Sequence, residues 1–408
     1  MDTDIMPDGI FTEEDLIRYA EVLLWGLENA SRRTFKKGDV ILIRYDHTAR
    51  YLMENVYALL IDKHFRPVIE PLPTPFMERE LYQNGSFGQL IFQQAGKAEL
   101  YQSLSGIITL MAPERLDHLA GVDPQTMAEA MEASAPVRRV LDKKLRAGKL
   151  GWTMGLYPTQ ALADVSNMSL KDYAQELKRC CFLMDPDPVK KWRRTQKEIR
   201  EIASWLDSFG SAKVHVESDL TDLTLEIGEN RRWWGCSGEN LPCCEIFTSP
   251  DYRTVTGKYF SNQPTIRHGK GVVGVELEFY DGIAVSANAA QGGHYIQGQL
   301  NMDAGARRVG EFSMTDKRYS GVTKFMGHTL VDENYGGESG NCHLALGDFL
   351  SSTFAGPLDV LTPQLQQDLG FNSSGIHWDL VNTLPKSIWF TPSGGKKMLV
   401  YENGLFQI

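Results

Sequence analysis

Long apolar segments are missing from this chain of 408 residues. Its most apolar runs, VILIRY, VYALLI and GIITLM, have the length of strands, whereas a membrane-spanning helix needs roughly 18 or more apolar residues. The first residues, MDTDIMPDGIFTEEDL, are acidic and lack the basic and apolar regions of a secretory signal. We therefore expect a globular, cytoplasmic protein with no membrane partner.

Clusters of basic residues and regularly spaced cysteines are also scarce. The net charge is -10, and the one dense basic run is Lys190–Arg194. Nucleic-acid binding needs clustered Lys and Arg, so no nucleic-acid partner is expected. The six cysteines include two adjacent pairs but no C-x-x-C motif, which indicates reduced thiols rather than a disulfide framework.

Several common catalytic motifs are absent. The sequence contains no Walker A motif, no G-x-S-x-G nucleophile elbow and no H-E-x-x-H zinc motif. No G-x-G-x-x-G motif lies in the first half of the chain, where strands and helices alternate. These absences exclude several nucleotide-handling and hydrolytic mechanisms, and they do not favour dinucleotide binding.

The first part of the chain alternates between apolar runs of strand length and segments with helical spacing. The expected elements are a helix over 12–32, a strand in KKGDVILIRYD, a helix over 49–63, a strand in RPVIEPLP, a short strand at 106–111 and a helix over 127–148. Such alternation is typical of a doubly wound, mainly parallel sheet. We therefore expect an N-terminal α/β domain over residues 1–188.

The pattern changes after Asp185–Pro188, where two prolines interrupt the helical spacing. A helix over 189–209 is expected next, followed by short alternating strands such as KVHVES, LTLEIG and GVVGVELEFY. The pair Asn403-Gly404 predicts a hairpin near the end of the sequence. These features indicate a second, α+β domain over 189–408 with a mostly antiparallel sheet. The candidate ligands described next would make it the metal-binding, catalytic domain.

Candidate metal ligands gather in the second part. The segment VDENYGGESGNCH, Val331–His343, combines carboxylates, glycines and a histidine between two segments that we expect to be strands. In GIHWD, His377 and Asp379 are two residues apart, so on a strand both side chains face the same way. Glu245 and Glu311 each lie in an apolar, strand-like context, where an unpaired carboxylate is unfavourable.

Each of these residues also has a structural interpretation. Taken one at a time, His343 and His377 fit hydrogen-bonded core histidines better than metal ligands, and Asp379 fits a turn residue better. Taken together, the four pieces predict a metal centre, because divalent metals that activate water prefer Asp, Glu and His ligands.

Read in order, the pieces KKGDVILIRYD, GLYPTQALA, DPDPVKKW, NLPCCEIFTSPD, ARRVGE, HTLVDEN, CHLALG and GIHWD resemble the M29 family of metalloaminopeptidases over essentially the whole length. This resemblance implies that Glu245, Glu311, His343, His377 and Asp379 bind metal, with Glu311 shared between two ions. It also implies that Glu333, in the family's DEN segment, is a metal ligand, and that Glu311 and Glu333 are catalytic.

Two departures from the family are visible. The connector between Glu333 and His343 is longer than in relatives, so Glu338 competes with Glu333 for the same role. The family often has a tyrosine seven residues after this histidine, where this chain has Leu350.

The resemblance further implies an aminopeptidase that hydrolyses the N-terminal bond of unblocked peptides, uses two divalent ions (zinc or cobalt) and forms a homodimer. The alternative is a mononuclear Fe(II) ring-opening dioxygenase of a dihydroxypyridine, with His343, His377 and Asp379 as a facial triad. Glu245 and Glu311, which such an iron site does not need, favour the peptidase. They also disfavour a binding protein without metal.

Overall fold

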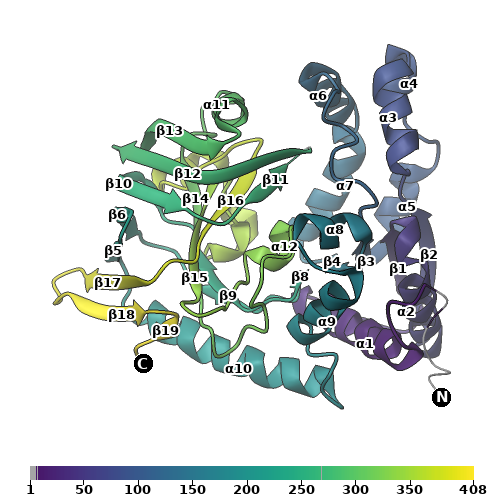
Figure 1. The fold of residues 1–408 in the computed structure, drawn as a ribbon, viewed down its shortest axis with the longest axis horizontal. Helices are drawn as coiled ribbons and strands as arrows, with labels where there is room; N and C mark the ends of the chain where they lie inside the picture. Colours follow the sequence, from purple (N-terminus) through teal and green to yellow (C-terminus); the bar gives the residue numbers. More distant parts are fainter. Residues whose placement is uncertain (1–5, 7, 268) are drawn as a thin grey trace. The chain divides into compact units, whose positions relative to one another are not determined.

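The computed structural model describes residues 6, 8–267 and 269–408, which form two compact units (Figure 1). The first unit extends to Val189 and also includes Ser237–Leu241. The second unit consists of Lys190–Cys236 and Pro242–Ile408. A five-residue segment from far along the sequence therefore completes the first unit.

The first unit is built on a parallel sheet. Its strands, in sheet order, are β2 (Arg66–Pro71), β1 (Val40–Tyr45), β3 (Leu104–Met111), β4 (Gly151–Leu156) and β8 (Asn240–Leu241). Every neighbouring pair runs parallel. This confirms the mainly parallel sheet expected for the first part of the chain.

Helices connect these strands. They are α1 (Glu13–Ala30), the 3-10 turn η1 (His47–Ala49), α2 (Arg50–Asp62), α3 (Pro75–Asn84), α4 (Phe87–Leu90), α5 (Lys97–Ser103), α6 (Pro124–Ala133), α7 (Ala135–Arg146), α8 (Gln160–Val165) and α9 (Leu170–Cys180). A capping box starts α1, with Thr12 and Asp15 each accepting the other's backbone N–H.

The single helix expected over 127–148 is wrong, because the chain forms α6 and α7 with a break at Ser134. Pro136, in the first turn of α7, has no backbone N–H and cannot continue the hydrogen-bond ladder of α6. Proline suits the first turn of a new helix instead.

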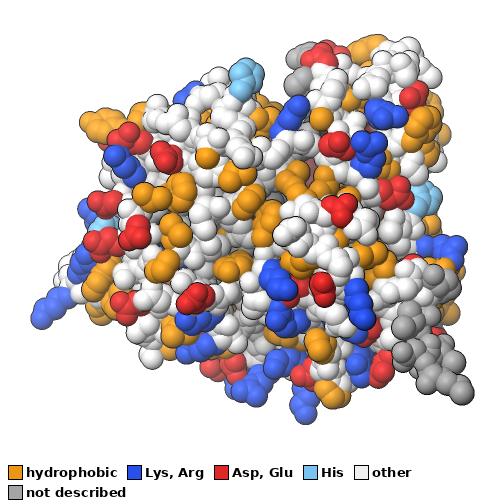
Figure 2. All heavy atoms as spheres, in the orientation of Figure 1, with side chains coloured by type: hydrophobic (Ala, Val, Ile, Leu, Met, Phe, Trp, Pro, Cys, Tyr) orange, Lys and Arg blue, Asp and Glu red, His pale blue; other side chains and the backbone are white. Residues whose placement is uncertain are grey.

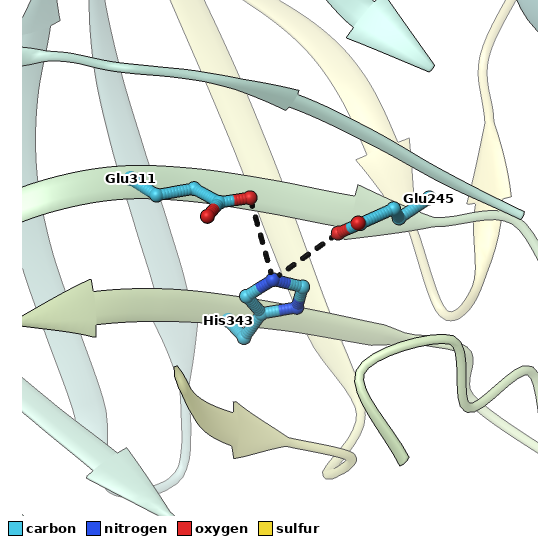
Figure 3. Close-up of side chains that lie close together, drawn as sticks. All are labelled: Glu245, Glu311 and His343. Carbon is cyan, nitrogen blue, oxygen red and sulfur yellow. Dashed lines mark ion pairs between the residues drawn. The ribbon is translucent and has the colours of Figure 1, made fainter. Parts of the chain in front are cut away.

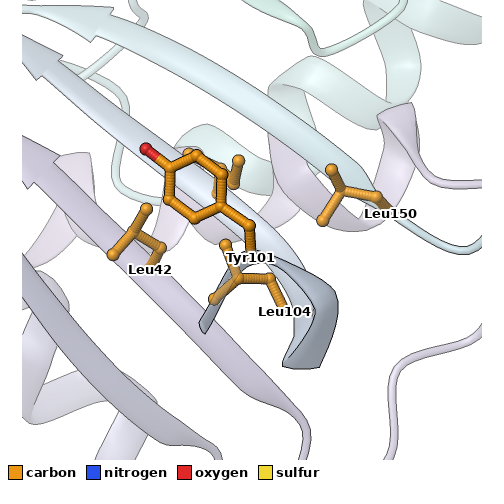
Figure 4. Close-up of a cluster of buried hydrophobic side chains, with 5 residues drawn as sticks. Leu42, Tyr101, Leu104 and Leu150 are labelled. Atoms are coloured by element: carbon orange, nitrogen blue, oxygen red, sulfur yellow. The ribbon is translucent and has the colours of Figure 1, made fainter. Parts of the chain in front are cut away.

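Apolar side chains cover the sheet of the first unit. One buried cluster, shown in Figure 4, comprises Leu42, Tyr101, Leu104, Ile107 and Leu150, with α7 packed against it. Helix α1 contacts α2, β3, β4 and β8. Gly106 of β3 makes room for α1, because a Cβ at this position would lie 3.0 Å from a methyl group of Leu27.

Antiparallel sheets dominate the second unit, which begins within helix α10 (Pro188–Asp207). The larger sheet contains β11 (Thr265–Arg267), β12 (Lys270–Tyr280), β10 (Asp251–Ser261), β6 (Thr221–Ile227), β5 (Ala212–Ser218), β17 (Lys386–Pro392), β18 (Met398–Glu402) and β19 (Leu405–Phe406), in that order, with β13 (Ile283–Gln291) beside β12. The expected hairpin is confirmed: β18 pairs with β19, and Asn403 and Gly404 have φ values of 44° and 87°.

A smaller five-stranded sheet lies in the same unit. Its order is β16 (His377–Asn382), β15 (Asn341–Gly347), β14 (Val309–Thr315), β9 (Glu245–Thr248) and β7 (Trp234–Gly235), and all its pairs are antiparallel. The mostly antiparallel second part is thus confirmed. The remaining elements are α11 (Gly293–Leu300), α12 (Thr329–Asp332), the 3-10 turns η2 (Ser351–Thr353) and η3 (Leu358–Val360), and α13 (Pro363–Asp368).

Acidic and basic side chains are interspersed over the surface visible in Figure 2. Within the described part of the chain, no helix has both the length and the apolar character required to cross a membrane.

Candidate metal centre

Four adjacent strands of the smaller sheet bring the candidate ligands onto one face. On β14, Glu311 pairs with Ala345 of β15, which in turn pairs with Asp379 of β16. Two residues further along β14, Ser313 pairs with His343. Because strand side chains alternate between faces, these residues share one face, and the small Ala345 leaves space between the two carboxylates.

The outer ligands follow from the same register. Glu245, at the start of β9, pairs with Thr315 of β14, two residues beyond Ser313. His377, at the start of β16, pairs with Gly347 of β15, which has no side chain to block it. The expectation that His377 and Asp379 face the same way on a strand is confirmed.

The side chains make two sets of close contacts. His343 Nε2 lies 3.2 Å from Glu245 Oε2 and 3.7 Å from Glu311 Oε1, and Figure 3 shows both carboxylates directed at this ring nitrogen. His377 Nε2 lies 3.0 Å from Glu311 Oε2 and 3.3 Å from Asp379 Oδ1. Each oxygen of Glu311 therefore faces a different histidine.

These contacts define two groups of potential ligands. The first is Glu245, Glu311 and His343, and the second is Glu311, His377 and Asp379. Within each group the ligand atoms lie within 4.8 Å of one another. Buried carboxylates and imidazoles at such spacing fit divalent cations, because the cations neutralise carboxylates that burial would otherwise penalise.

Neutral polar groups orient the ligands. Ser313 Oγ donates a 2.8 Å hydrogen bond to Glu245 Oε2. His343 Nδ1 lies 3.3 Å from Asn341 Oδ1, and His377 Nδ1 lies 2.9 Å from the carbonyl oxygen of Asp348. Acceptors at both Nδ1 atoms place the proton there, which leaves each Nε2 available to bind a metal. No pattern in the sequence distinguishes Ser313 or Asn341 from other polar residues of strands.

Burial and mutual charge shift the ionisation of the group. Burial raises the pKa of Glu245, and the charge of Glu311 adds to this effect. Burial also opposes ionisation of Glu311 and Asp379, but the histidines outweigh it: His343 and His377 lower the pKa of Glu311, and His377 lowers the pKa of Asp379 to about 2.

Glu333 lies beside this group, immediately after α12. Its side chain is buried, and burial together with the charges of Glu245 and Asp379 raises its pKa well above the ordinary value. Glu338 is exposed instead, and Lys317 donates to its backbone carbonyl oxygen at 2.8 Å. Of the two competing glutamates, the buried one is therefore Glu333.

The segment before this loop is a helical turn rather than the expected strand. The Asp332 carboxylate accepts hydrogen bonds from the backbone N–H groups of Met326 at 2.6 Å and His328 at 2.8 Å. These bonds fold the chain back and start α12 at Thr329. Leu350 lies at the start of η2, where its side chain offers no hydrogen-bond donor.

A family model described as thermophilic metalloprotease (M29) matches residues 12–406. The chain belongs to the M29 family. Among the relatives of this M29 chain, aminopeptidase PepS of Streptococcus thermophilus is 26% identical, over 71% of this chain and 73% of its own length. Aminopeptidase 2 of Geobacillus stearothermophilus is 25% identical, over 75% and 77% respectively.

The fold agrees with this assignment. The solved structure titled wild-type AmpT from Thermus thermophilus superimposes with a TM-score of 0.81, covering 97% of this M29 chain and 99% of that chain at 19% identity. The parallel sheet of the first unit and the antiparallel sheets of the second match that fold. In the structure of this M29 chain, five of the ligands predicted from the sequence lie together, and Glu333 lies beside them. The five are Glu245, Glu311, His343, His377 and Asp379.

Proposed function

We propose that this metalloaminopeptidase hydrolyses the N-terminal peptide bond of unblocked peptides with two divalent cations. The cations would be held by the two ligand groups, with Glu311 as the shared ligand. The observation that carries the proposal is that each oxygen of Glu311 faces a different histidine, 3.7 Å and 3.0 Å away. A carboxylate placed in this way could serve both groups, and two-metal sites use such a pair of cations to activate water and to stabilise the developing charge.

The cations, when bound, polarise the scissile carbonyl group and lower the pKa of a water molecule to about 7. The residues of the chain supply the remaining chemistry. Ser313 holds the Glu245 carboxylate by a hydrogen bond, and Asn341 and the Asp348 carbonyl fix the histidine rings. A fixed arrangement reduces the reorganisation needed during the reaction.

Glu333 would transfer the proton. Its buried carboxyl group, with a pKa raised by burial and by Glu245, suits a group that takes a proton from water and delivers it to the leaving amine. A general base works best when its pKa lies near the operating pH, and burial among carboxylates shifts a glutamate in that direction. Its assignment as an additional metal ligand is the other role to be tested.

The dioxygenase alternative receives no support from the relatives, which are aminopeptidases by name. A mononuclear site built from His343, His377 and Asp379 would leave Glu245 and Glu311 without a role. Both carboxylates lie against the histidine rings and would add negative charge around a single iron. This geometry favours a pair of cations.

We further propose zinc or cobalt as the ions, a cytoplasmic location and a homodimeric assembly. Carboxylate and imidazole ligands accept several transition ions, so metal supply decides among them. Size measurement in solution tests the assembly.

The decisive experiment combines metal analysis of the purified protein with peptide hydrolysis. Two metal ions per chain, and release of the first amino acid from unblocked but not from N-acetylated peptides, are the expected results. One iron per chain with oxygen consumption on a dihydroxypyridine would refute the proposal. Equal cleavage of blocked and unblocked peptides would refute the requirement for a free N-terminus.

A further inference from the structure

A small pocket adjoins the candidate metal centre within the second unit. Its walls come from the connection between β10 and β11, from the segment that leads into α12, and from Asp379 and Val381 of β16. The centre of a water molecule can move within about 10 Å³ of this pocket. The pocket therefore holds a single water molecule or a group of similar size.

The pocket lies on the ligand face of the smaller sheet. Val381 and Asp379 follow His377 at intervals of two along β16, so their side chains share its face. The β10–β11 connection runs along this strand: the backbone N–H of Gln263 donates to the Val381 carbonyl at 3.3 Å, and Trp378 Nε1 donates to Thr265 Oγ1 at 3.3 Å.

The side-chain amide oxygen of Gln263 is buried and accepts no hydrogen bond from the described residues. The residue is 7% exposed. A buried amide oxygen is unfavourable unless it is paired. Since Gln263 lines the pocket, this oxygen indicates that the occupant is a hydrogen-bond donor.

The other polar groups of the pocket are largely engaged. Thr265 Oγ1 accepts from Trp378, and the Asp332 carboxylate accepts from two backbone N–H groups. Asp379 Oδ1 lies 3.3 Å from His377 Nε2 and belongs to the second group of potential metal ligands. Gln263 Oε1 is therefore the side-chain acceptor that we assign to the occupant, and an N–H group such as that of an amine suits it.

The charge of the pocket favours the same occupant. None of the described residues that line it is lysine or arginine. Its one histidine, His328, accepts a hydrogen bond at Nδ1 from the backbone of Leu330. Burial lowers the pKa of His328 to about 4, so this ring is neutral near pH 7. The side chains that line the pocket therefore add no positive charge that would repel an amine.

We propose that this pocket receives the free α-amino group of the peptide substrate, with Gln263 Oε1 as its acceptor. The inference rests on the proposed aminopeptidase function and adds Gln263 as a positioning residue. A pocket of this size has no room for an acetyl group on the nitrogen. It therefore provides a steric reason for selecting unblocked peptides.

The test uses the metal-loaded protein and two compounds that cannot be hydrolysed: a phosphinic analogue of Ala-Ala, and the same compound without its amino group. Calorimetry gives the affinity for each. Wild-type protein should prefer the amino compound, and Gln263→Leu should reduce this preference about tenfold or more, as expected for one hydrogen bond to a charged group. Affinity for the compound without the amino group should not change, which shows that the metal centre is intact.

Two variants serve as controls. Gln263→Glu keeps an acceptor at the same place and should retain the preference. Gln299→Leu removes another buried amide oxygen that has no partner among the described residues but lies in α11, outside the pocket, and should leave the preference unchanged. Retention of the full preference in Gln263→Leu would overturn the inference. Failure of the wild-type protein to cleave unblocked peptides would instead overturn the proposed function.

Discussion

Glu311 is the residue on which both ligand groups depend. Its two carboxylate oxygens face His343 and His377, and its side chain is 3% exposed. Glu311 is a member of both groups, so a substitution at this position removes a potential ligand from each of them.

We expect Glu311→Gln to lower peptide hydrolysis at least about 100-fold, since even residues behind the metal ligands contribute 10–100-fold. Glutamine has the same shape, but its amide nitrogen cannot bind a cation. Metal analysis should show fewer than two ions per chain, and circular dichroism should show a folded protein. The exposed Glu338→Gln is the matched control, and full activity in Glu311→Gln would refute the shared role.

Ser313 offers a milder test. Its hydroxyl donates to Glu245 Oε2, so Ser313→Ala leaves that carboxylate less firmly oriented. We expect metal affinity to fall about 10–100-fold while the maximal activity at saturating metal changes less. Titration of the metal-free protein measures this affinity, and an unchanged dissociation constant would show that the hydrogen bond does not support the site.

At this scale the sequence was informative only about charged residues. His377 and Asp379 were predicted from their spacing, and Glu245 and Glu311 from their apolar surroundings. Ser313, Asn341 and Gln263 were missed because neutral polar residues in strands are common. What distinguishes them is the register between strands, which the sequence does not state. The choice between Glu333 and Glu338 required burial, which differs although both lie in one loop.

The four strands β9, β14, β15 and β16 act as a frame for the ligands. Alternation along β15 directs Ala345 toward the ligand face and Leu344 toward the opposite face, although both are fully buried. Of these two neighbouring residues, Ala345 therefore affects the space around the candidate ligands, whereas Leu344 affects the packing of the core.

We expect Ala345→Val to weaken metal binding, because two added methyl groups would enter the space between Glu311 and Asp379. The overpacking should also cost about 1–3 kcal/mol of unfolding free energy. Leu344→Ala should instead cost about 2–5 kcal/mol through a core cavity while metal affinity is retained. Metal titration and denaturant unfolding of both variants give the comparison, and loss of metal in Leu344→Ala alone would contradict the assignment of faces.

Elements with clear periodicity were predictable, whereas those fixed by distant contacts were not. Strands β5 and β6 alternate between buried and less buried positions, as their sequences indicate. Strand β8 has two residues and joins the first unit's sheet through β4, which no local pattern reveals. Helix α12 was mistaken for part of a strand because its start depends on the Asp332 hydrogen bonds.

For the whole molecule, the candidate metal centre links stability to pH. Burial opposes the charge of His343, but Glu245 and Glu311 outweigh it and raise the pKa of His343 well above its ordinary value. In the metal-free protein this ion pair stabilises the fold fully below about pH 6.5, the pKa of an unfolded histidine, and the stabilisation is lost as pH rises through the raised pKa.

The stabilisation that a bound metal ion gives has the opposite pH dependence, because a metal ion binds the deprotonated imidazole and so binds more tightly as pH rises. We therefore expect a chelator to lower the melting temperature more at about pH 8 than at about pH 6. Thermal unfolding with and without chelator at both values measures the difference. Equal shifts at the two pH values would show that the histidines do not bind the metal.

The order of the ligands along the sequence has a consequence for biosynthesis. Glu245, Glu311 and His343 emerge from the ribosome before His377 and Asp379, which complete the second group. A growing chain, or a fragment that ends before His377, therefore lacks the second candidate group even if its first unit has already folded. A peptidase arranged in this way would gain its activity only after His377 and Asp379 have been synthesised.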